Sequence, residues 1–427
     1  MTKPGSRLGL IAATLCVGAF ALQSSSHSQT SAPPSPNAAM IAKGRYLAAL
    51  GDCASCHTRE GGPALAGGFA LNTPFGTIYS ANITQDKTTG IGSWSQTDFE
   101  RTMNEGQDNH KRNLYPAMPY PSYTHVTKGD VDAIFAYLKM VKPVHYTPPP
   151  NRLQFPLTIR PLLFFWNWLY LRHGPIAVPA RASPQWVRGA YIVQGLGHCG
   201  ACHTPKTIFQ GDKYDDALQG DVLDNWFASD LTGDPRAGLA SWSAADIVEF
   251  LKTGRNARSS ASGSMSPVIV HSMSKMSDTD LKAIAVYLKS VPEAKSETQP
   301  QHPAAALMAQ GRAVYVDECS ACHKMDGAGV ARFFPPLRGN ANVQQTDPTT
   351  LLHYILTGTQ TATTSARPTP FSMPTYAWKL NDDELAALAT YIRNSWGNAA
   401  ATVSADQVKD LRRKVAAHPQ RKPPSKV

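Results

Sequence analysis

The chain has 427 residues, of which 42% are hydrophobic and 17% are charged. This composition is typical of a soluble globular protein with several small cores, and the length suggests about three domains. The net charge of +10 does not indicate a nucleic-acid partner, because half of it lies after residue 401, where seven Lys and Arg residues stand against Asp406 and Asp410.

Residues 1–32 have the pattern of an export signal. Lys3 and Arg7 precede an apolar run over residues 8–22, and a Ser-rich stretch follows. The run is too short to span a bilayer and has the flanks of a signal peptide. We therefore predict a cleaved signal and a mature chain at the periplasmic face of the bacterial cytoplasmic membrane. An uncleaved anchor is the alternative.

A C-x-x-C-H motif occurs three times, at residues 53–57, 199–203 and 319–323. In this motif two thiols form thioether bonds to haem, and the histidine that follows ligates the iron. A single copy could belong to a zinc site or a redox dithiol, but three copies that all end in His favour c-type haem. We predict three covalently attached haem c groups, which are bound through Cys53, Cys56, Cys199, Cys202, Cys319 and Cys322.

Each motif lies inside a repeated unit that begins and ends with a helical pattern. The first helix carries a glycine ahead of the motif (Gly44, Gly189 and Gly311), and the last helix is amphipathic, over residues 130–139, 280–289 and 383–393. We predict an all-α fold of three tandem small cytochrome c domains with long irregular connecting loops. Their expected bounds are 33–150, 181–295 and 296–400.

The first two units share more than the motif. Ser95 and Asp98 match Ser243 and Asp246, in each case after a Trp, and both pairs predict a helix start with a carboxylate at the third position. The third unit is shorter and has a predicted middle helix over residues 350–357.

The third unit also offers a partner for its motif histidine. A Phe-Pro-Pro-Leu loop at residues 334–337 could supply a backbone carbonyl to the ring N–H of His323, and such a bond would fix the orientation of the imidazole.

Two segments lie outside the three units. Residues 151–180 form a connector whose aromatic run, 162–171, is too short to cross a bilayer as a helix. It is either a strap packed over the first two domains or a docking or membrane-surface patch. Residues 401–427 form a basic tail, which either contacts anionic lipid or an acidic partner, or is solvated and disordered.

A second axial ligand is expected for each haem, and methionine is the usual choice in cytochromes c. Met118, Met265 and Met373 each follow a motif and precede the last helix of their unit, near prolines that favour an extended loop. Met118 follows His57 by 61 positions, and Met265 follows His203 by 62.

Other residues compete for these ligand positions. Met273 and Met276 are alternatives to Met265, and ligation by two histidines through His125 or His271 stays open. Met103 and Met140 are interpreted as core residues on helical apolar faces, and Met325 follows His323 too closely to reach the opposite haem face. His110, His173 and His353 are interpreted as surface or packing residues. His198 is expected at a haem edge.

With these features the chain resembles the tri-haem cytochrome c subunit of periplasmic membrane-bound dehydrogenases of acetic acid bacteria. The resemblance covers essentially the whole mature chain, and it rests on the three motifs, on residues 195–205 around the second motif, and on the segments 372–374 and 395–397. Members of that family serve alcohol, gluconate, sorbitol or fructose dehydrogenases. The resemblance implies that the iron ligands are His57, His203, His323, Met118, Met265 and Met373.

The resemblance also implies the partners. A separate large subunit that holds FAD or PQQ would oxidise the substrate, and this chain would pass the electrons to ubiquinone, in peripheral contact with the membrane. The sequence has no dinucleotide-binding glycine fingerprint placed for a flavin and no nucleophile constellation, so we predict no catalytic residues and no substrate chemistry. The main alternative is a free-standing periplasmic multi-haem electron shuttle, and a weaker one is a peroxidase-like cytochrome.

Overall fold

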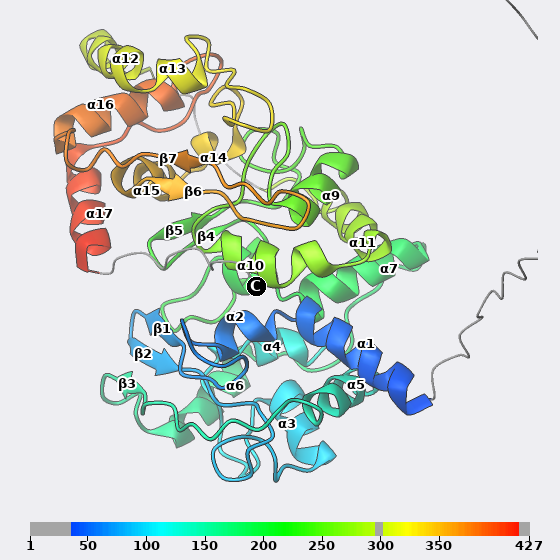
Figure 1. Cartoon of the computed structure of the whole chain (residues 1–427). Helices are drawn as coiled ribbons and strands as arrows, with labels where there is room; N and C mark the ends of the chain where they lie inside the picture. Colours follow the sequence, from blue (N-terminus) through cyan, green and yellow to red (C-terminus); the bar gives the residue numbers. More distant parts are fainter. Residues whose placement is uncertain (1–35, 295–301, 418–427) are drawn as a thin grey trace, which may run out of the picture.

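The computed structural model describes residues 36–294 and 302–417 (Figure 1), so the predicted signal peptide lies outside the described residues. The chain forms three helical modules that follow one another in sequence order across the molecule. Module 1 runs from α1 to α5, module 2 from α7 to α11, and module 3 from α12 to α16.

One helix pair organises each module. In module 1, α1 (Pro36–Leu50) packs on α5 (Lys128–Leu138); in module 2, α7 (Pro184–Ala190) packs on α11 (Asp278–Leu288); in module 3, α12 (Ala305–Glu318) packs on α16 (Asp382–Arg393). The helix α7 continues into a π-helical turn over Tyr191–Leu196. The three amphipathic patterns at the unit ends are therefore confirmed as helices.

A glycine marks the crossing point in all three pairs. A Cβ atom on Gly44, Gly189 or Gly311 would lie 1.8, 2.0 or 2.1 Å from a backbone carbonyl oxygen of the facing helix. These distances are far below van der Waals contact, so only a residue without a side chain lets the two backbones approach this closely. The repeated glycine seen in the sequence is thus a packing requirement.

The predicted helix starts are present. Ser95 begins α3 (Gln96–Glu105) and Ser243 begins α9 (Ala244–Thr253), and each forms a reciprocal capping box with the aspartate three residues on. The predicted middle helix of module 3 is α15 (Thr349–Thr357). Shorter helices complete the modules: α4 (Tyr120–Tyr123), α10 (Met265–His271) and α14 (Ala341–Gln344).

The fold is mostly helical, as predicted, and short strands in the loops accompany the helices. Strands β1 (Ala70–Thr73), β2 (Gly76–Tyr79) and β3 (Arg152–Leu153) form an antiparallel sheet. Modules 2 and 3 each add a two-stranded ladder: β4 (Asp221–Leu223) with β5 (Trp226–Ala228), and β6 (Thr359–Gln360) with β7 (Ser372–Met373). The loops that we expected to be irregular pair their backbone groups locally, because buried amides and carbonyls need partners.

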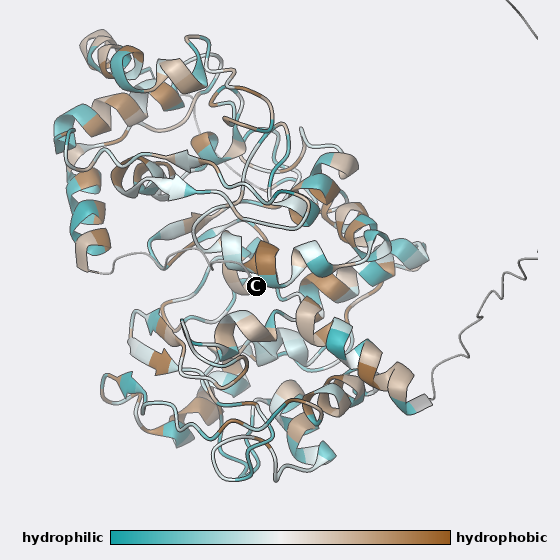
Figure 2. Ribbon diagram, in the orientation of Figure 1, coloured by the Kyte–Doolittle hydropathy of each residue, from teal (hydrophilic) through white to brown (hydrophobic). Residues whose placement is uncertain are grey.

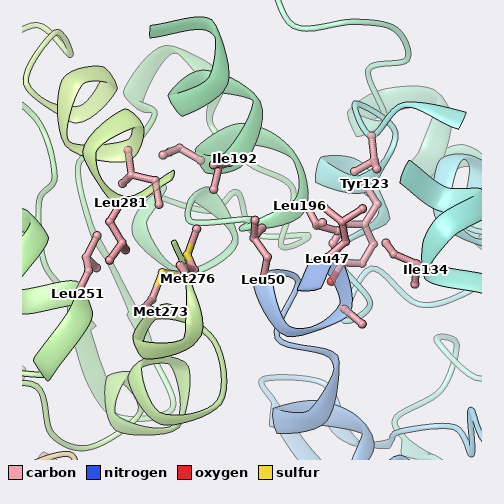
Figure 3. Packing of buried hydrophobic residues seen from close by; sticks show 14 of the residues in the cluster. Leu47, Leu50, Tyr123, Ile134, Ile192, Leu196, Leu251, Met273, Met276 and Leu281 are labelled. Atoms are coloured by element: carbon pink, nitrogen blue, oxygen red, sulfur yellow. The ribbon is translucent and has the colours of Figure 1, made fainter. Parts of the chain in front are cut away.

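Modules 1 and 2 share one hydrophobic core, whereas module 3 has a core of its own. Figure 3 shows Leu47 and Leu50 of module 1 in one cluster with Leu196, Met276 and Leu281 of module 2. The first two modules are therefore packed as one body.

Two equivalent tyrosines cross the boundary between modules 1 and 2. The Tyr46 hydroxyl donates a hydrogen bond to Oδ2 of Asp280, and the Tyr191 hydroxyl donates one to Oδ2 of Asp130, both at 2.6 Å. Tyr46 and Tyr191 each stand two residues after the crossing glycine of their module. The interface is therefore reciprocal, with each module contributing the same donor and the same acceptor.

Both aspartates are also paired inside their own module. Asp130 lies 2.6 Å from Lys43, and Asp280 lies 2.8 Å from Arg188. Burial alone would raise the pKa of Asp280, but hydrogen bonds from Arg188 and Tyr46 outweigh it and hold this pKa below its usual range. Its stabilising contribution is therefore complete at neutral pH and is lost as the pH falls through the lowered value.

Replacing Tyr46 by Phe is expected to lower the free energy of unfolding by about 2 kcal/mol, because the lost hydrogen bond joins a charged carboxylate. Tyr191→Phe should cost a similar amount. Tyr137→Phe is the matched control, since Tyr137 packs on Gly44 inside module 1. Chemical denaturation of the haem-loaded chain measures the free energy of unfolding of all three variants. Equal losses of this free energy would contradict a stabilising role for the Tyr46 and Tyr191 hydrogen bonds.

The connector packs over the first two modules, as one of the two interpretations predicted. The strand β3 pairs with β2, and the helix α6 (Leu163–Tyr170) receives a hydrogen bond from Tyr120 of module 1 at Asn167 (2.6 Å). On the module 2 side, Trp166 Nε1 donates to the carbonyl of Phe209 at 2.8 Å.

Of the two alternatives for the tail, the disordered one is wrong for residues 405–417. They form α17 (Ala405–Ala417), which packs on α15 and α16 with Val408 and Leu411 buried. Arg412 donates to Asp382 at 2.8 Å. The net charge of the tail gave no sign of Val408 and Leu411, which stand three positions apart and pack α17 onto α15 and α16. Residues 418–427 lie outside the described residues.

None of the helices in the described ranges is long and apolar enough to cross a membrane. Figure 2 shows hydrophobic and hydrophilic residues mixed along the helices.

Candidate haem sites

The three motifs occupy equivalent places. They form short helices directly after the first long stretch of each module: α2 (Cys53–His57), α8 (Gly200–His203) and α13 (Ser320–His323). One helical turn places the two cysteines on the same side and the histidine just beyond them. No disulfide joins the cysteines of the described ranges, and burial raises the pKa of Cys53, Cys199 and Cys319 to about 12, which keeps these thiols protonated.

Each motif histidine is oriented by a backbone carbonyl. The Nδ1 atom of His57 lies 2.7 Å from the Ala81 oxygen, and that of His203 lies 2.6 Å from the Ser229 oxygen. Donation through Nδ1 directs the lone pair of Nε2 away from the carbonyl, where it can bind a metal. Burial lowers the pKa of both rings, which favours the neutral form that a metal requires.

The third module follows the same rule. His323 Nδ1 lies 3.0 Å from the Pro335 oxygen, inside the loop that the sequence pointed to. Burial lowers the pKa of His323 as well. The partners in modules 1 and 2 were not predicted, although a signal existed: Ala81 and Ser229 stand directly before the matching Asn-Ile-Thr and Asp-Leu-Thr segments.

The three candidate methionines lie at the edge of a core. Met118, Met265 and Met373 are half-buried, the first two against the shared core and the third against the core of module 3. By contrast, Met273 and Met276 are 4% and 1% exposed, and they are packed among the apolar residues of the shared core. This placement favours Met265 over its two competitors.

Of the two competing histidines, His125 is engaged elsewhere, and His271 lies on the same helix as Met265. Nδ1 of His125 is 2.6 Å from the carbonyl oxygen of Gly174, and His271 ends the helix α10. His198, expected at a haem edge, packs its ring on Tyr123 of module 1 at 5.7 Å between centroids. His353 is a packing residue, stacked on Trp226 at 3.9 Å. Met103 is buried as predicted, but the prediction that Met140 is a core residue is wrong: it follows the end of α5 and is 65% exposed.

Comparison with known proteins supports the haem sites that the geometry of the three motifs indicates. The family model for cytochrome c matches residues 41–142 and 308–396. The gluconate 2-dehydrogenase cytochrome c subunit of Pantoea cypripedii is 42% identical over 398 residues, which cover 88% of this chain and 90% of that protein. The chain belongs to the family of dehydrogenase cytochrome c subunits.

Two further relatives support this. The cytochrome c subunit of alcohol dehydrogenase (quinone) from Gluconacetobacter polyoxogenes is 40% identical, over 89% of this chain and 85% of that protein. The fructose dehydrogenase cytochrome subunit of Gluconobacter japonicus is 35% identical, over 89% and 84%. The resemblance inferred from the motifs is confirmed, and the cytochrome c subunit has electron transfer as its function.

The residues present fit haem in a further respect. Nε and Nη1 of Arg255 and Nε of Arg367 are buried and have no hydrogen-bond partner within the described residues. Arg255 comes from module 2 and Arg367 from module 3, and burial together with the Arg367 charge lowers the pKa of Arg255. Paired guanidinium groups with spare donors suit a carboxylate, and haem carries two propionates. No local pattern in the sequence indicates this pair of arginines.

Replacing Arg255 by Met in the haem-loaded cytochrome subunit is expected to lower one haem midpoint potential by up to about 60 mV, the equivalent of a tenfold change for one electron. The positive charge of Arg255 disfavours the oxidised, more positive iron, so its removal favours that state and lowers the potential. Spectroelectrochemical titration measures this, with the exposed Arg312→Met as control. If the Arg255 and Arg312 variants both leave all haem midpoint potentials unchanged, Arg255 does not influence a haem potential.

Proposed function

We propose that this chain carries electrons from a FAD- or PQQ-containing dehydrogenase large subunit to ubiquinone at the periplasmic face of the cytoplasmic membrane. The observation that carries the proposal is the repetition within one chain of a C-x-x-C-H helix whose histidine is oriented by a carbonyl, at 2.7, 2.6 and 3.0 Å. Each haem, when bound, supplies a one-electron redox couple.

The side chains have separate tasks in this proposal. The cysteines hold three haem c groups covalently, and His57, His203 and His323 are the proximal ligands. Met118, Met265 and Met373 complete the coordination, which raises the potential and leaves no open position for oxygen or peroxide. The sites therefore suit electron transfer better than the peroxidase-like alternative.

The packing of the modules supports transfer within one chain. Modules 1 and 2 share a core and are tied by the reciprocal Tyr46 and Tyr191 bonds. Module 3 is held to module 2 by the ion pair of Arg332 with Glu249 at 2.7 Å and by the stacking of His353 on Trp226. Sites held at fixed separations exchange electrons without a diffusional encounter.

The donor and the acceptor are inferred from the relatives. One is named for gluconate, one for alcohol with a quinone and one for fructose, and all three are subunits of dehydrogenases. A cytochrome subunit of this kind receives electrons from a partner that oxidises the substrate. The free-standing shuttle would need no such partner.

Detergent extraction followed by affinity purification of the chain distinguishes the two. We expect a larger subunit to copurify from the membrane fraction and to contain FAD or PQQ by fluorescence and mass analysis. Recovery of the haem-loaded chain alone from the soluble periplasmic fraction would contradict the subunit role and favour the shuttle.

A further inference from the structure

The outer face of the connector exposes an unusual number of large apolar side chains. Nine of them are between 41% and 81% exposed, seven in the connector and two in a neighbouring loop of module 2: Phe155, Ile159, Leu162, Phe164, Phe165, Trp168, Leu169, Ile208 and Phe209. We call this set the connector face. Soluble chains rarely expose so many apolar side chains together unless they meet another apolar phase.

The connector face is held in place from behind. Trp166 binds the Phe209 carbonyl through Nε1 at 2.8 Å, which joins the connector to the exposed loop of module 2. The ring of Tyr170 packs on Gly211, where a Cβ would lie 2.2 Å from it, and the Tyr170 carbonyl accepts a bond from Tyr214 at 2.8 Å. The helix α6 therefore cannot turn its exposed residues inward without breaking these contacts.

Along the chain the charge of this segment has one sign, although Asp212, Asp215 and Asp216 line a pocket together with Leu169 and Arg172. From residue 133 to residue 211 the chain has no Asp or Glu, whereas it has eight Lys and Arg residues. Three of them are paired with carboxylates outside this segment: Arg160 with Asp108, Arg188 with Asp280 and Lys206 with Asp212. Arg152, Arg172 and Arg181 of the same segment are exposed.

We propose that the connector face is the surface by which this chain lies on an anionic phospholipid bilayer. This deepens the proposed function, on whose membrane location it rests. A short helix that exposes Phe, Trp and Leu between arginines has the composition of an interfacial element, with rings at the headgroup level and guanidinium groups near phosphate. The positive flanks complement the negative surface of such a membrane.

The test is flotation of the haem-loaded chain with vesicles of phosphatidylcholine alone and of phosphatidylcholine with phosphatidylglycerol. We expect tighter binding to the anionic vesicles, weakened by salt. The triple variant Phe164→Ser, Phe165→Ser, Trp168→Ser should lower the binding constant at least roughly 100-fold, because three large apolar groups no longer enter the bilayer. Trp378→Ser is the matched control: Trp378 is 78% exposed in module 3, and Trp168 is 75% exposed.

A single substitution provides a second test in case the triple variant misfolds. Ile208→Ser changes a side chain that is 80% exposed on the other module, and it should weaken anionic-vesicle binding several-fold with an unchanged haem spectrum. Wild-type binding by all of these variants, or no binding of the wild-type chain to either vesicle, would overturn the proposal.

Two other outcomes separate this proposal from its alternatives. If the triple variant binds vesicles normally but loses its dehydrogenase subunit, the connector face contacts protein, and the proposal is wrong. The triple variant should still reduce a short-chain ubiquinone analogue in detergent. If the wild-type complex cannot do so, the proposed function fails, whatever the flotation shows.

Discussion

Replacing Gly189 by Ala is expected to lower the free energy of unfolding of module 2 by about 3 kcal/mol. The new Cβ would lie 2.0 Å from the Ala283 oxygen and 2.8 Å from the Tyr287 Cβ, so the helices α7 and α11 must separate. Because module 2 shares its core with module 1, the loosening should reach both. Thermal unfolding of the haem-loaded chain, followed by far-ultraviolet circular dichroism, should show a fall of roughly 6–12 °C in the unfolding temperature.

The matched control is Gly129→Ala. Gly129 lies in the first turn of α5, and a Cβ there would meet nothing within 4 Å. Alanine should leave stability unchanged or raise it by roughly 0.5 kcal/mol, since glycine is the poorer helix former. Gly44→Ala and Gly311→Ala should behave like Gly189→Ala. Similar unfolding temperatures for the Gly189 and Gly129 variants would contradict the crossing geometry.

Replacing Met265 by His is expected to lower the midpoint potential of one haem on the order of 0.2 V, within the roughly 0.8 V that axial ligands span. Thioether ligation raises the potential, and a second imidazole removes that effect. A redox titration of the haem-loaded chain, followed at the haem absorption bands, should show one transition moved and two unchanged.

Met276→Leu is the control for this variant. Met276 is 1% exposed in the shared core, so Leu should repack there at a cost below about 1.5 kcal/mol and leave all three potentials in place. If Met265→His changes no potential, or if Met276→Leu changes one, the ligand assignment in module 2 is wrong.

The features that sequence predicted best are those determined by neighbouring residues. The capping boxes at Ser95 and Ser243 need only a partner three positions away, and the structure confirms both. The Pro335 carbonyl lies twelve positions after His323, in a loop whose prolines limit its path, and this hydrogen bond was also found.

The features that were missed join distant parts of the chain. The Tyr46 bond to Asp280 spans 234 positions, and the Arg255 and Arg367 pair joins two modules, so no local pattern indicates either. The tail was left open between a disordered and a binding segment, because its charge alone does not decide between them. The spacing of Val408 and Leu411, which are buried on one side of α17, indicates the ordered helix.

Anaerobic mixing of the purified complex tests directly whether electrons pass through this chain from a dehydrogenase subunit to ubiquinone. The complex is mixed with the dehydrogenase substrate and then with a short-chain ubiquinone analogue, and the haem absorption bands are followed. We expect the substrate to reduce all three haems and the quinone to reoxidise them. Haems that stay oxidised while quinone is reduced, or reduced haems that quinone cannot reoxidise, would contradict this electron path.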